Sequence, residues 1–543
     1  MARSYIRELF SLQLGRCPGN LRPTMTKRIK RIFGWGLFSL GTLVLSGVLL
    51  ADHLTPPATG APSHALAVQP DQTLLDQELA PLLARRPGES GVIMLVDGRD
   101  AFAARAIATR RAGRSIDLMY YIWQDDLAGH LLLSELRQAA ERGVRVRMLL
   151  DDINVKGKDG ALLAMVGHPN IEVRVYNPFR NRDGIGRLLE MVQRSWSINH
   201  RMHNKAWIAD GRVAVVGGRN VGVEYFDAAE DTNFRDLDVA LFGPAVEEAS
   251  AIFDTFWNSD QVVPISALNR KSRRTLEAVM GQIREETRSP QAQRFLEKVD
   301  TSDNVRRYIT QNLTPYWTDR IRVLSDPPDK RPSEDRLQWL IHAILDDLAS
   351  ARHKALLISP YFVPGNEGVV ALADAARRHD AHVGVITNSL VANDVLAVHS
   401  GYSKYRELLL KAGIHLYETK ADVATDSSLF GSSGASLHTK AYLVDDRRGF
   451  VGSFNMDPRS INLNTEMGVL FDDSELAGAL REEYLTLSSP ELSYWLYLDE
   501  KHRLRWLDGA TEPPTVHTTE PGASLLQRSI VRVLGWLPIE SQL

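Results

Sequence analysis

Two segments of the chain carry the same spacing of chemically active side chains, 235 residues apart (438 − 203 = 235). Each has a histidine, a lysine two residues later, an aspartate five residues after the lysine, and a glycine-containing turn that ends in asparagine. The first set is His203, Lys205, Asp210, Gly217, Gly218 and Asn220. The second set is His438, Lys440, Asp445, Gly452, Ser453 and Asn455. A repeat with no gap inside either copy predicts one active site built from two halves.

The spacing places the polar groups of each copy on one side of a strand. His203 and Lys205 lie two residues apart beside apolar runs that are typical of short strands. Alternate strand residues face the same side, so the imidazole and the ammonium group point the same way. A glycine lets the backbone approach a ligand, and the asparagine supplies an amide. Two copies thus surround one tetrahedral anion, which predicts a phosphate site. Its expected phosphate-binding residues are Asn220, Asn455, Gly218 and Ser453.

Such a site also needs groups that set the charges of its two histidines. A histidine that attacks phosphorus must be neutral, whereas one that protonates a leaving oxygen must begin as imidazolium. A carboxylate that accepts a ring N–H orients the imidazole and supports its charge. Glu466 is one candidate for this role, and the choice between Asp236 and Asp238 for the other stays open.

The aspartates of the two motifs have a different expected role. Asp210 and Asp445 belong to the repeated catalytic motif, but each follows its lysine by five residues and so faces the other side of the strand. We therefore expect them to be structural partners at the strand end rather than proton carriers.

The repeated motif resembles the HKD signature of the phospholipase D superfamily. Within that superfamily, the chain is similar to the bacterial cardiolipin synthases from about residue 95 to the C-terminus. The similar stretches are LMYYIWQDDLAGHLL (118–132), GVRVRMLLDD (143–152), RMHNKAWIADGRVAVVGGRNVG (201–222), ISPYFVP (358–364), ITNSLVANDVLAVHSGY (386–402) and GSFNMDPRSINLNTEMG (452–468). The resemblance implies an α/β fold with two phospholipase-D-like α/β/α sandwich lobes, related by pseudo-twofold symmetry around one shared active site.

The resemblance also implies an activity, namely a phosphatidyltransferase that makes cardiolipin through a phosphohistidine intermediate. Superfamily precedent makes His203 the nucleophile and His438 the acid that protonates the departing alcohol, although the symmetry of the motifs leaves this order open. The implied substrates are phosphatidylglycerol and a second phospholipid, phosphatidylethanolamine in the nearest relatives. Two alternatives use the same site: a phospholipase D that hydrolyses phospholipid to phosphatidic acid, and a nuclease on the same fold.

Composition restricts the partners of the chain. With 543 residues it should contain at least two domains. A formal net charge of −3 and the lack of an aromatic and basic stripe disfavour nucleic acid as a ligand. Cys17 is the only cysteine, so no intramolecular disulfide is expected. Because the motif cations and amides can neutralise a phosphate, and no metal-ligand spacing occurs elsewhere, we expect no metal and no other cofactor.

Residues 32–51 form a run of uncharged positions that predicts a transmembrane anchor. At 1.5 Å per residue, twenty residues span about 30 Å, the thickness of a bilayer core. Lys27, Arg28, Lys30 and Arg31 precede the run, which puts the N-terminus in the cytoplasm and the catalytic part outside it. We therefore expect a single-pass protein of the bacterial inner membrane. A cleaved signal peptide with its site near 65–67 is the alternative, and Met25 is an alternative start.

Apolar strands that alternate with amphipathic helices predict the domain plan. Its parts are a basic tail (1–31), the anchor (32–51), a linker (52–70), lobe 1 (71–265), an inter-lobe segment (266–335), lobe 2 (336–490) and a C-terminal extension (491–543). In the last part, apolar residues recur around Arg528 and Arg532 between 525 and 537. This pattern fits both a helix on a membrane surface and a helix packed on the catalytic body.

Overall fold

The computed structural model describes residues 60–543 except 155–158, 180–189, 192–193, 195–196, 231, 269–274, 303–304, 308–313, 331–335 and 422–435, together with Trp35, Ser39 and Thr42. The chain divides into two compact units, Met1–Pro57 and Ala58–Leu543, and the second contains every element below. Apart from those three residues, the predicted anchor lies outside the described part. Within that part, no helix combines the length and the apolar character needed to cross a bilayer.

The first lobe is built on a nine-stranded sheet. Its strands, in spatial order, are β10 (Val262–Pro264), β4 (Ile171–Tyr176), β3 (Arg145–Asp151), β2 (Ser115–Tyr120), β6 (Ala206–Ala209), β7 (Val213–Gly217), β9 (Asp238–Phe242), β1 (Ser90–Leu95) and β11 (Tyr316–Thr318). β2, β3 and β4 run parallel, and their neighbours pair antiparallel. These parallel strands are buried along almost their whole length, because both faces of this part of the sheet are covered.

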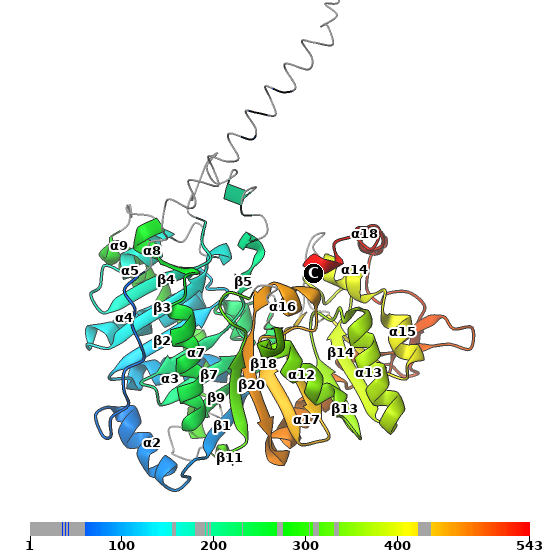
Figure 1. Cartoon of the computed structure of the whole chain (residues 1–543), viewed down its shortest axis with the longest axis horizontal. Coiled ribbons are helices and arrows are strands. Elements are labelled where there is room, and N and C mark those ends of the chain that lie inside the picture. The colour runs from blue at the N-terminus through cyan, green and yellow to red at the C-terminus, as the bar shows by residue number, and fades with distance from the viewer. Residues whose placement is uncertain are drawn as a thin grey trace, which may run out of the picture. The chain divides into compact units, whose positions relative to one another are not determined.

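The second lobe repeats this plan on a ten-stranded sheet. Its strands, in spatial order, are β12 (Ile321–Ser325), β20 (Met467–Asp472), β18 (Arg448–Gly452), β17 (Ala441–Val444), β13 (Lys354–Ile358), β14 (His382–Asn388), β15 (His415–Thr419), β21 (Ser493–Leu498), β22 (Leu504–Asp508) and β23 (Thr515–His517). The order β15-β14-β13-β17-β18-β20-β12 matches β4-β3-β2-β6-β7-β9-β1 strand for strand, and the two sheets stand side by side in Figure 1. The predicted two-lobed α/β fold is confirmed.

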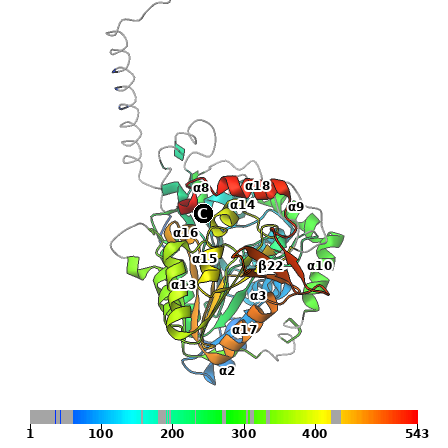
Figure 2. The same cartoon turned by 90° about the vertical axis from the view of Figure 1, so that its right-hand side faces the viewer.

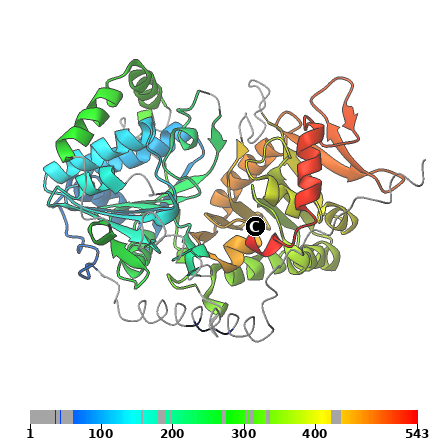
Figure 3. The same ribbon diagram turned by 90° about the horizontal axis from the view of Figure 1, so that it is seen from above.

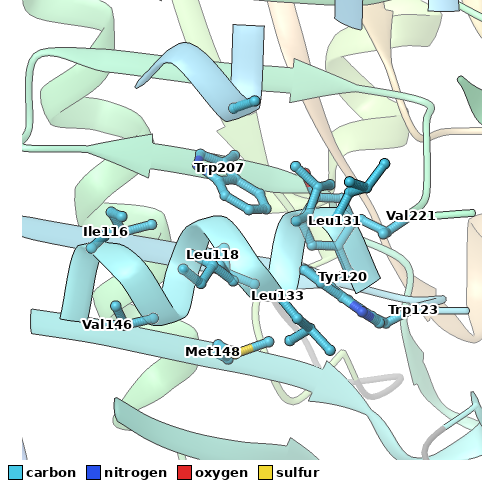
Figure 4. Close-up of a cluster of buried hydrophobic side chains, with 14 of the residues drawn as sticks. Ile116, Leu118, Tyr120, Trp123, Leu131, Leu133, Val146, Met148, Trp207 and Val221 are labelled. Atoms are coloured by element: carbon cyan, nitrogen blue, oxygen red, sulfur yellow. The ribbon is translucent and has the colours of Figure 1, made fainter. Parts of the chain in front are cut away.

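Helices cover the outer face of each sheet. The helices of the first lobe there are α3 (Gly98–Arg111), α4 (Leu127–Glu141), α5 (Asp159–Met165), α9 (Leu276–Thr287) and α10 (Pro290–Asp300), and α2 (Leu74–Ala84) precedes them. Those of the second lobe are α12 (Leu340–Ala349), α13 (Gly365–His379), α14 (Leu396–Tyr402) and α15 (Arg406–Lys411). Figure 4 shows part of the outer core of the first lobe, a cluster that contains Leu131 and Leu133 of α4, Leu118 of β2 and Met148 of β3.

The inner faces of the two sheets share one hydrophobic cluster. It contains Phe253 of α7 (Pro244–Trp257) and Leu480 of α17 (Ser474–Leu487), together with strand residues of both lobes such as Val216 and Val451. Because the cluster is continuous, each lobe buries apolar surface against the other. The position of one lobe relative to the other is therefore set by a core and not only by surface contacts.

The predicted elements differ from the structure mainly at boundaries. In the second lobe, a short turn separates α14 from α15. β12 lies in the expected inter-lobe segment but is an edge strand of the second sheet, and β21 to β23 of the expected extension continue that sheet. In the expected linker, the backbone N–H groups of Ser63 and Ala65 donate to Asn258 and Asp254 of the first lobe.

Asp210 and Asp445 occupy equivalent turns at the end of each lobe's motif hairpin. Both adopt left-handed backbone conformations, with φ of 54° and 52°, which aspartate tolerates better than most residues. The Asp210 carboxylate accepts N–H bonds from three successive residues, Gly113 (2.9 Å), Arg114 (2.7 Å) and Ser115 (2.9 Å).

The Asp445 carboxylate repeats this pattern in the second lobe. Its donors are the N–H groups of Arg352, His353 and Lys354, at 3.0, 2.7 and 2.9 Å. Each aspartate therefore ties its hairpin to the start of the neighbouring strand, β2 or β13. These contacts support the structural role expected from the spacing, and they do not place either aspartate among the reacting groups.

We expect Asp210→Ala to reduce stability rather than chemistry. Three N–H groups would lose their acceptor, that of Ser115 in a buried bond and the other two in partly buried bonds, so the free energy of unfolding should fall by about 2–4 kcal/mol. Thermal and urea unfolding measure this loss. Turnover per folded molecule should stay within about threefold of the parent protein, and a far larger loss in fully folded protein would give Asp210 a role in the reaction.

Candidate active site

Two short parallel ribbons join the lobes at the repeated motifs. β5 (Arg201–Met202) of the first lobe pairs with β19 (Asn464–Thr465) of the second. β8 (Phe234–Arg235) of the first lobe pairs with β16 (Ser436–Leu437) of the second. In each ribbon, the residue that follows one strand is a motif histidine, and the residue that follows the other strand is an acid. The ribbons therefore fix each histidine beside a carboxylate of the opposite lobe.

The two histidine–carboxylate pairs are reciprocal across the lobes. Nδ1 of His203 lies 2.7 Å from Oε2 of Glu466. Nδ1 of His438 lies 2.6 Å from Oδ2 of Asp236. Because Nδ1 of each ring is bound to an acid, Nε2 of each ring is the nitrogen left for a substrate. The structure thus brings both motif histidines into one site, with an orienting carboxylate from each lobe.

Asp238, the other acid considered for this role, lies elsewhere. Its Oδ2 accepts from Nη2 of Arg105 at 2.8 Å, in an ion pair that is buried on both sides. Its Oδ1 accepts the N–H of Arg219 at 3.2 Å. Asp236, and not Asp238, is therefore the acid that contacts a motif histidine. Asp238 instead neutralises an arginine in the interior of the first lobe.

Gly218 and Ser453 occupy equivalent positions behind the two orienting acids. A Cβ atom on Gly218 would lie 2.2 Å from Oδ1 of Asp236, so only glycine leaves room for that carboxylate. In the second lobe, the hydroxyl of Ser453 donates to Oε2 of Glu466. Both residues, expected to bind phosphate, thus contact the carboxylates that hold the histidines.

The two predicted phosphate-binding asparagines differ in their surroundings. Asn220 accepts the N–H of Ile122 at 3.1 Å and donates to the hydroxyl of Tyr225 at 3.0 Å, which leaves one amide hydrogen for a ligand. Oδ1 of Asn455 is buried and has no hydrogen-bond partner within the described part of the chain. Asn455 therefore keeps more of its hydrogen-bonding capacity free than Asn220 does.

Lys205 and Lys440 are buried cations of the same site. Each ammonium group donates to the carbonyl of its own motif histidine, His203 or His438. Burial lowers the pKa of Lys205 to about 7, although the charge of Glu466 opposes this. Burial likewise lowers the pKa of Lys440 to about 8, against the charge of Asp236. The charge of Lys440 also lowers the pKa of Lys205, so the two cations repel each other in the absence of an anion.

Burial also acts on the two histidines. It lowers the pKa of His203 to about 4, while the charge of Glu466 raises it. Burial and the charge of Lys440 lower the pKa of His438, against Asp236. Without substrate, His203 is therefore neutral above about pH 4, which is the form that can attack phosphorus.

The two orienting acids keep their charge although both are buried. Burial alone would raise the pKa of Glu466, but the charges of His203 and Lys205 and two side-chain hydrogen bonds lower it. The pKa of Asp236 is lowered too, since the charges of His438 and Lys440 outweigh its burial. Both acids are consequently carboxylates near neutral pH and accept from the ring N–H of their histidines.

Aromatic rings pack against both imidazoles. The ring of Tyr121 meets His203 edge-on, with centroids 5.0 Å apart. Tyr225 meets His438 edge-on at 5.3 Å, and Phe234 stacks on the same imidazole at 5.4 Å. Rings on these faces limit rotation of the imidazoles and restrict water beside them.

Asp326 and Lys330, which the sequence did not single out, support Glu466 from behind. Oδ2 of Asp326 accepts the backbone N–H of Glu466, and the N–H of Asp326 donates to the Glu466 carbonyl, both at 2.9 Å. The buried ammonium group of Lys330 lies 2.8 Å from Oδ2 of Asp326 and also donates to the carbonyls of Ser460 and Asn464. The only sequence signal was a charged SDPPDK segment, which is more often a solvated loop.

Asp151 and Asn388, at the ends of β3 and β14, also hold equivalent points of the motifs. Oδ2 of Asp151 accepts the N–H of Met202 at 2.9 Å, and Oδ1 of Asn388 accepts the N–H of Leu437 at 3.0 Å. Each therefore fixes the residue that precedes a motif histidine.

Among the residues that the structure describes, no group of three or more His, Cys, Asp or Glu side chains is arranged to hold a metal ion.

Comparison with known proteins assigns the family. The family model described as "Cardiolipin synthase, PLD-like domain" matches residues 107–257 and 344–487, which are the cores of the two lobes. Cardiolipin synthase C of Escherichia coli is 37% identical over 479 residues, covering 86% of this chain and 99% of that protein. The chain therefore belongs to the phospholipase D superfamily, as the motifs predicted, and is an enzyme of that superfamily.

More distant relatives agree with this assignment. A cardiolipin synthase of Staphylococcus aureus is 25% identical over 424 residues, covering 77% of this chain and 71% of that protein. The crystal structure of the phosphatidylserine synthase of Haemophilus influenzae has a TM-score of 0.55 at 14% identity and covers 83% of this chain and 95% of that one. This structural likeness supports the fold.

The lowered lysine pKa values predict an alkaline limit to activity. A lysine is charged only below its pKa, so Lys205 and Lys440 should lose their charges as the pH rises through about 7 and 8. We expect kcat/KM for a phospholipid substrate to fall across this range, because a neutral amine attracts the phosphate less. Lys440→Arg, which keeps its charge, should remove the part of the fall near pH 8 and leave the part near pH 7 that belongs to Lys205. A rate that stays level to pH 10 in both proteins would contradict the prediction.

Asp326→Asn tests the support of Glu466. The amide can accept fewer N–H bonds and no longer pairs with Lys330, so Glu466 should shift and kcat should fall by roughly 10- to 100-fold with little change in KM. Because burial of an unpaired charge also costs stability, melting temperature is measured alongside. Asp347→Asn, which removes the negative charge and one of the two oxygens that accept from Tyr442 and Arg448 in the second lobe, is the control. Equal kcat per folded molecule in the two variants would make Asp326 merely structural.

Proposed function

We propose that this enzyme is a membrane-anchored phosphatidyltransferase that makes cardiolipin from phosphatidylglycerol and a second phospholipid, phosphatidylethanolamine. The observation that carries the chemistry is the pair of buried imidazoles, each bound through Nδ1 to a carboxylate of the other lobe and flanked by a buried lysine. The similarity to cardiolipin synthase C over 86% of the chain supports the choice of substrate class.

In the first step, Nε2 of neutral His203 attacks the phosphorus of the donor phospholipid. The bond between phosphorus and the headgroup oxygen breaks, and His438 gives its proton to that oxygen, so ethanolamine leaves. The negative charge of the non-bridging oxygens is met by Lys205 and Lys440 and by the amides of Asn220 and Asn455. Binding of the anionic phosphate raises the pKa of His438, which lets it enter the step protonated.

In the second step, a glycerol hydroxyl of phosphatidylglycerol replaces the protein at phosphorus. His438, now neutral, takes the hydroxyl proton as the new P–O bond forms and the P–N bond to His203 breaks. The products are cardiolipin and the enzyme in its starting protonation state. Water in place of the hydroxyl would give phosphatidic acid, so transfer and hydrolysis differ only in what occupies the acceptor position.

The setting of the reaction follows from the proposed anchor at 32–51. An enzyme tethered to the bacterial inner membrane takes both lipids from the same bilayer, and the basic residues before the anchor place the catalytic part on the extracytoplasmic side. The reaction as written uses no metal and no cofactor, because protein cations and amides balance the phosphate charge.

Trapping of the covalent intermediate tests both the reaction and the roles of the histidines. A phosphatidyl ester of p-nitrophenol needs little acid assistance to leave, so His438→Ala should release about one equivalent of nitrophenolate and retain a phosphatidyl adduct on His203. His203→Ala should give neither burst nor adduct. Both variants should lose roughly 10²–10⁴-fold or more in steady-state turnover.

Product analysis with the natural lipids completes this test. Labelled phosphatidylethanolamine and phosphatidylglycerol should yield labelled cardiolipin, and phosphatidic acid alone would identify a hydrolase. His382→Ala, at the exposed start of β14, is the matched control and should retain full turnover. An adduct that forms in His203→Ala instead would reverse the roles of the two histidines.

A further inference from the structure

The helix α18 (Leu525–Leu534) turns an apolar stripe toward the outside of the second lobe. Its exposed positions are spaced by three and four residues, the spacing of one helix face, and the following turn continues the face. They are Leu525, Leu526, Ser529, Arg532, Val533, Trp536 and Leu537. Leu525 and Trp536 are 77% and 76% exposed. Five large apolar side chains on one exposed face are unusual for a surface that meets only water.

The opposite face of α18 explains why the helix is held there. Val531 is buried, and α18 packs on α14, as Figures 2 and 3 show from two directions. A capping box of Ser524 and Gln527 fixes its first turn. The sequence left open whether this segment packs on the body or meets a membrane. One face of α18 packs on the catalytic body and the apolar stripe stays exposed. The helix can therefore pack on the body and meet a membrane at the same time.

The chain that follows α18 contacts residues of both lobes, two of which lie close in sequence to the motifs. The carboxylate of Glu540 accepts from Tyr405 and from Lys404, at 3.3 Å for the latter. The N–H of Arg459, in α16 (Pro458–Asn462) just after the second motif, donates to the Leu543 carbonyl at 2.6 Å. Gln542 accepts from Asn199, just before β5 and His203. The apolar stripe is thus connected, through the last residues of the chain, to a segment of each lobe that adjoins a motif in the sequence.

We propose that the α18 face, defined by Leu525, Leu526, Val533, Trp536 and Leu537, is a docking surface for a bilayer that contains anionic phospholipid. Its apolar side chains insert at the level of the headgroups, where tryptophan is favoured, and exposed Arg532 within the stripe meets the lipid phosphates. Contact here brings the C-terminal residues that bind Asn199 and Arg459 close to the lipids.

A fluorescent label tests this contact in the full chain without any need for activity. In a Cys17→Ser background, Leu526→Cys carries nitrobenzoxadiazole, and the protein is reconstituted in phosphatidylethanolamine–phosphatidylglycerol vesicles with some spin-labelled lipid. We expect at least about twofold quenching at position 526. Leu485→Cys is the control and should remain unquenched, since Leu485 is 51% exposed and belongs to α17, which lies at the bottom of Figure 1 while α18 lies at the top. Equal quenching at the two positions would overturn the proposal.

Two further measurements separate the other possible occupants and the role in turnover. Disulfide-linked dimers of Leu526→Cys without lipid quenching would show that a second copy covers the face, and would overturn the proposal. Leu525→Glu with Leu526→Glu should lower turnover of vesicle substrate by about tenfold, with turnover in detergent micelles within about twofold of the parent. Equal turnover on vesicles would also contradict the proposal. Failure of the proposed function would leave the quenching result unchanged, so the two failures are distinguishable.

Discussion

The structure depends on a reciprocal exchange of carboxylates between two similar lobes. Glu466 of the second lobe holds His203 of the first, and Asp236 of the first holds His438 of the second. An imidazole that has lost most of its hydration keeps its tautomer and direction only through such a partner. Because neither lobe contains both members of a pair, neither can build a working histidine alone. The shared hydrophobic cluster and the two short ribbons place the partners.

The two halves of the site are similar but not identical. Glu466 is supported by the Ser453 hydroxyl and by the Asp326–Lys330 pair, whereas the Asp236 carboxylate fills the space that Gly218 leaves and its carbonyl accepts from Arg219. These different supports keep the same histidine–acid geometry in both halves. The two histidines consequently have different charges and hydrogen bonds around them. An enzyme needs such a difference if one histidine attacks phosphorus and the other transfers protons.

Much of the site could be predicted from the sequence because its chemistry is repeated at a constant offset. Two copies of His, Lys and Asn identify the reacting groups, and the strand period places Asp210 and Asp445 away from them. The exchange of acids between lobes could not be predicted, since spacing along the chain does not show which lobe a carboxylate faces. The same reason hid Asp326 and Lys330, whose charged loop becomes buried only when β12 joins the second sheet.

Ring-nitrogen NMR tests the exchange of carboxylates most directly. In protein with ¹⁵N-labelled histidine, Glu466→Gln should shift the Nδ1 signal of His203 and leave that of His438 in place, while Asp236→Asn should do the reverse. This result would establish that each lobe orients the histidine of the other. If each substitution instead moved the signal of the histidine in its own lobe, the account of a site shared between lobes would be contradicted.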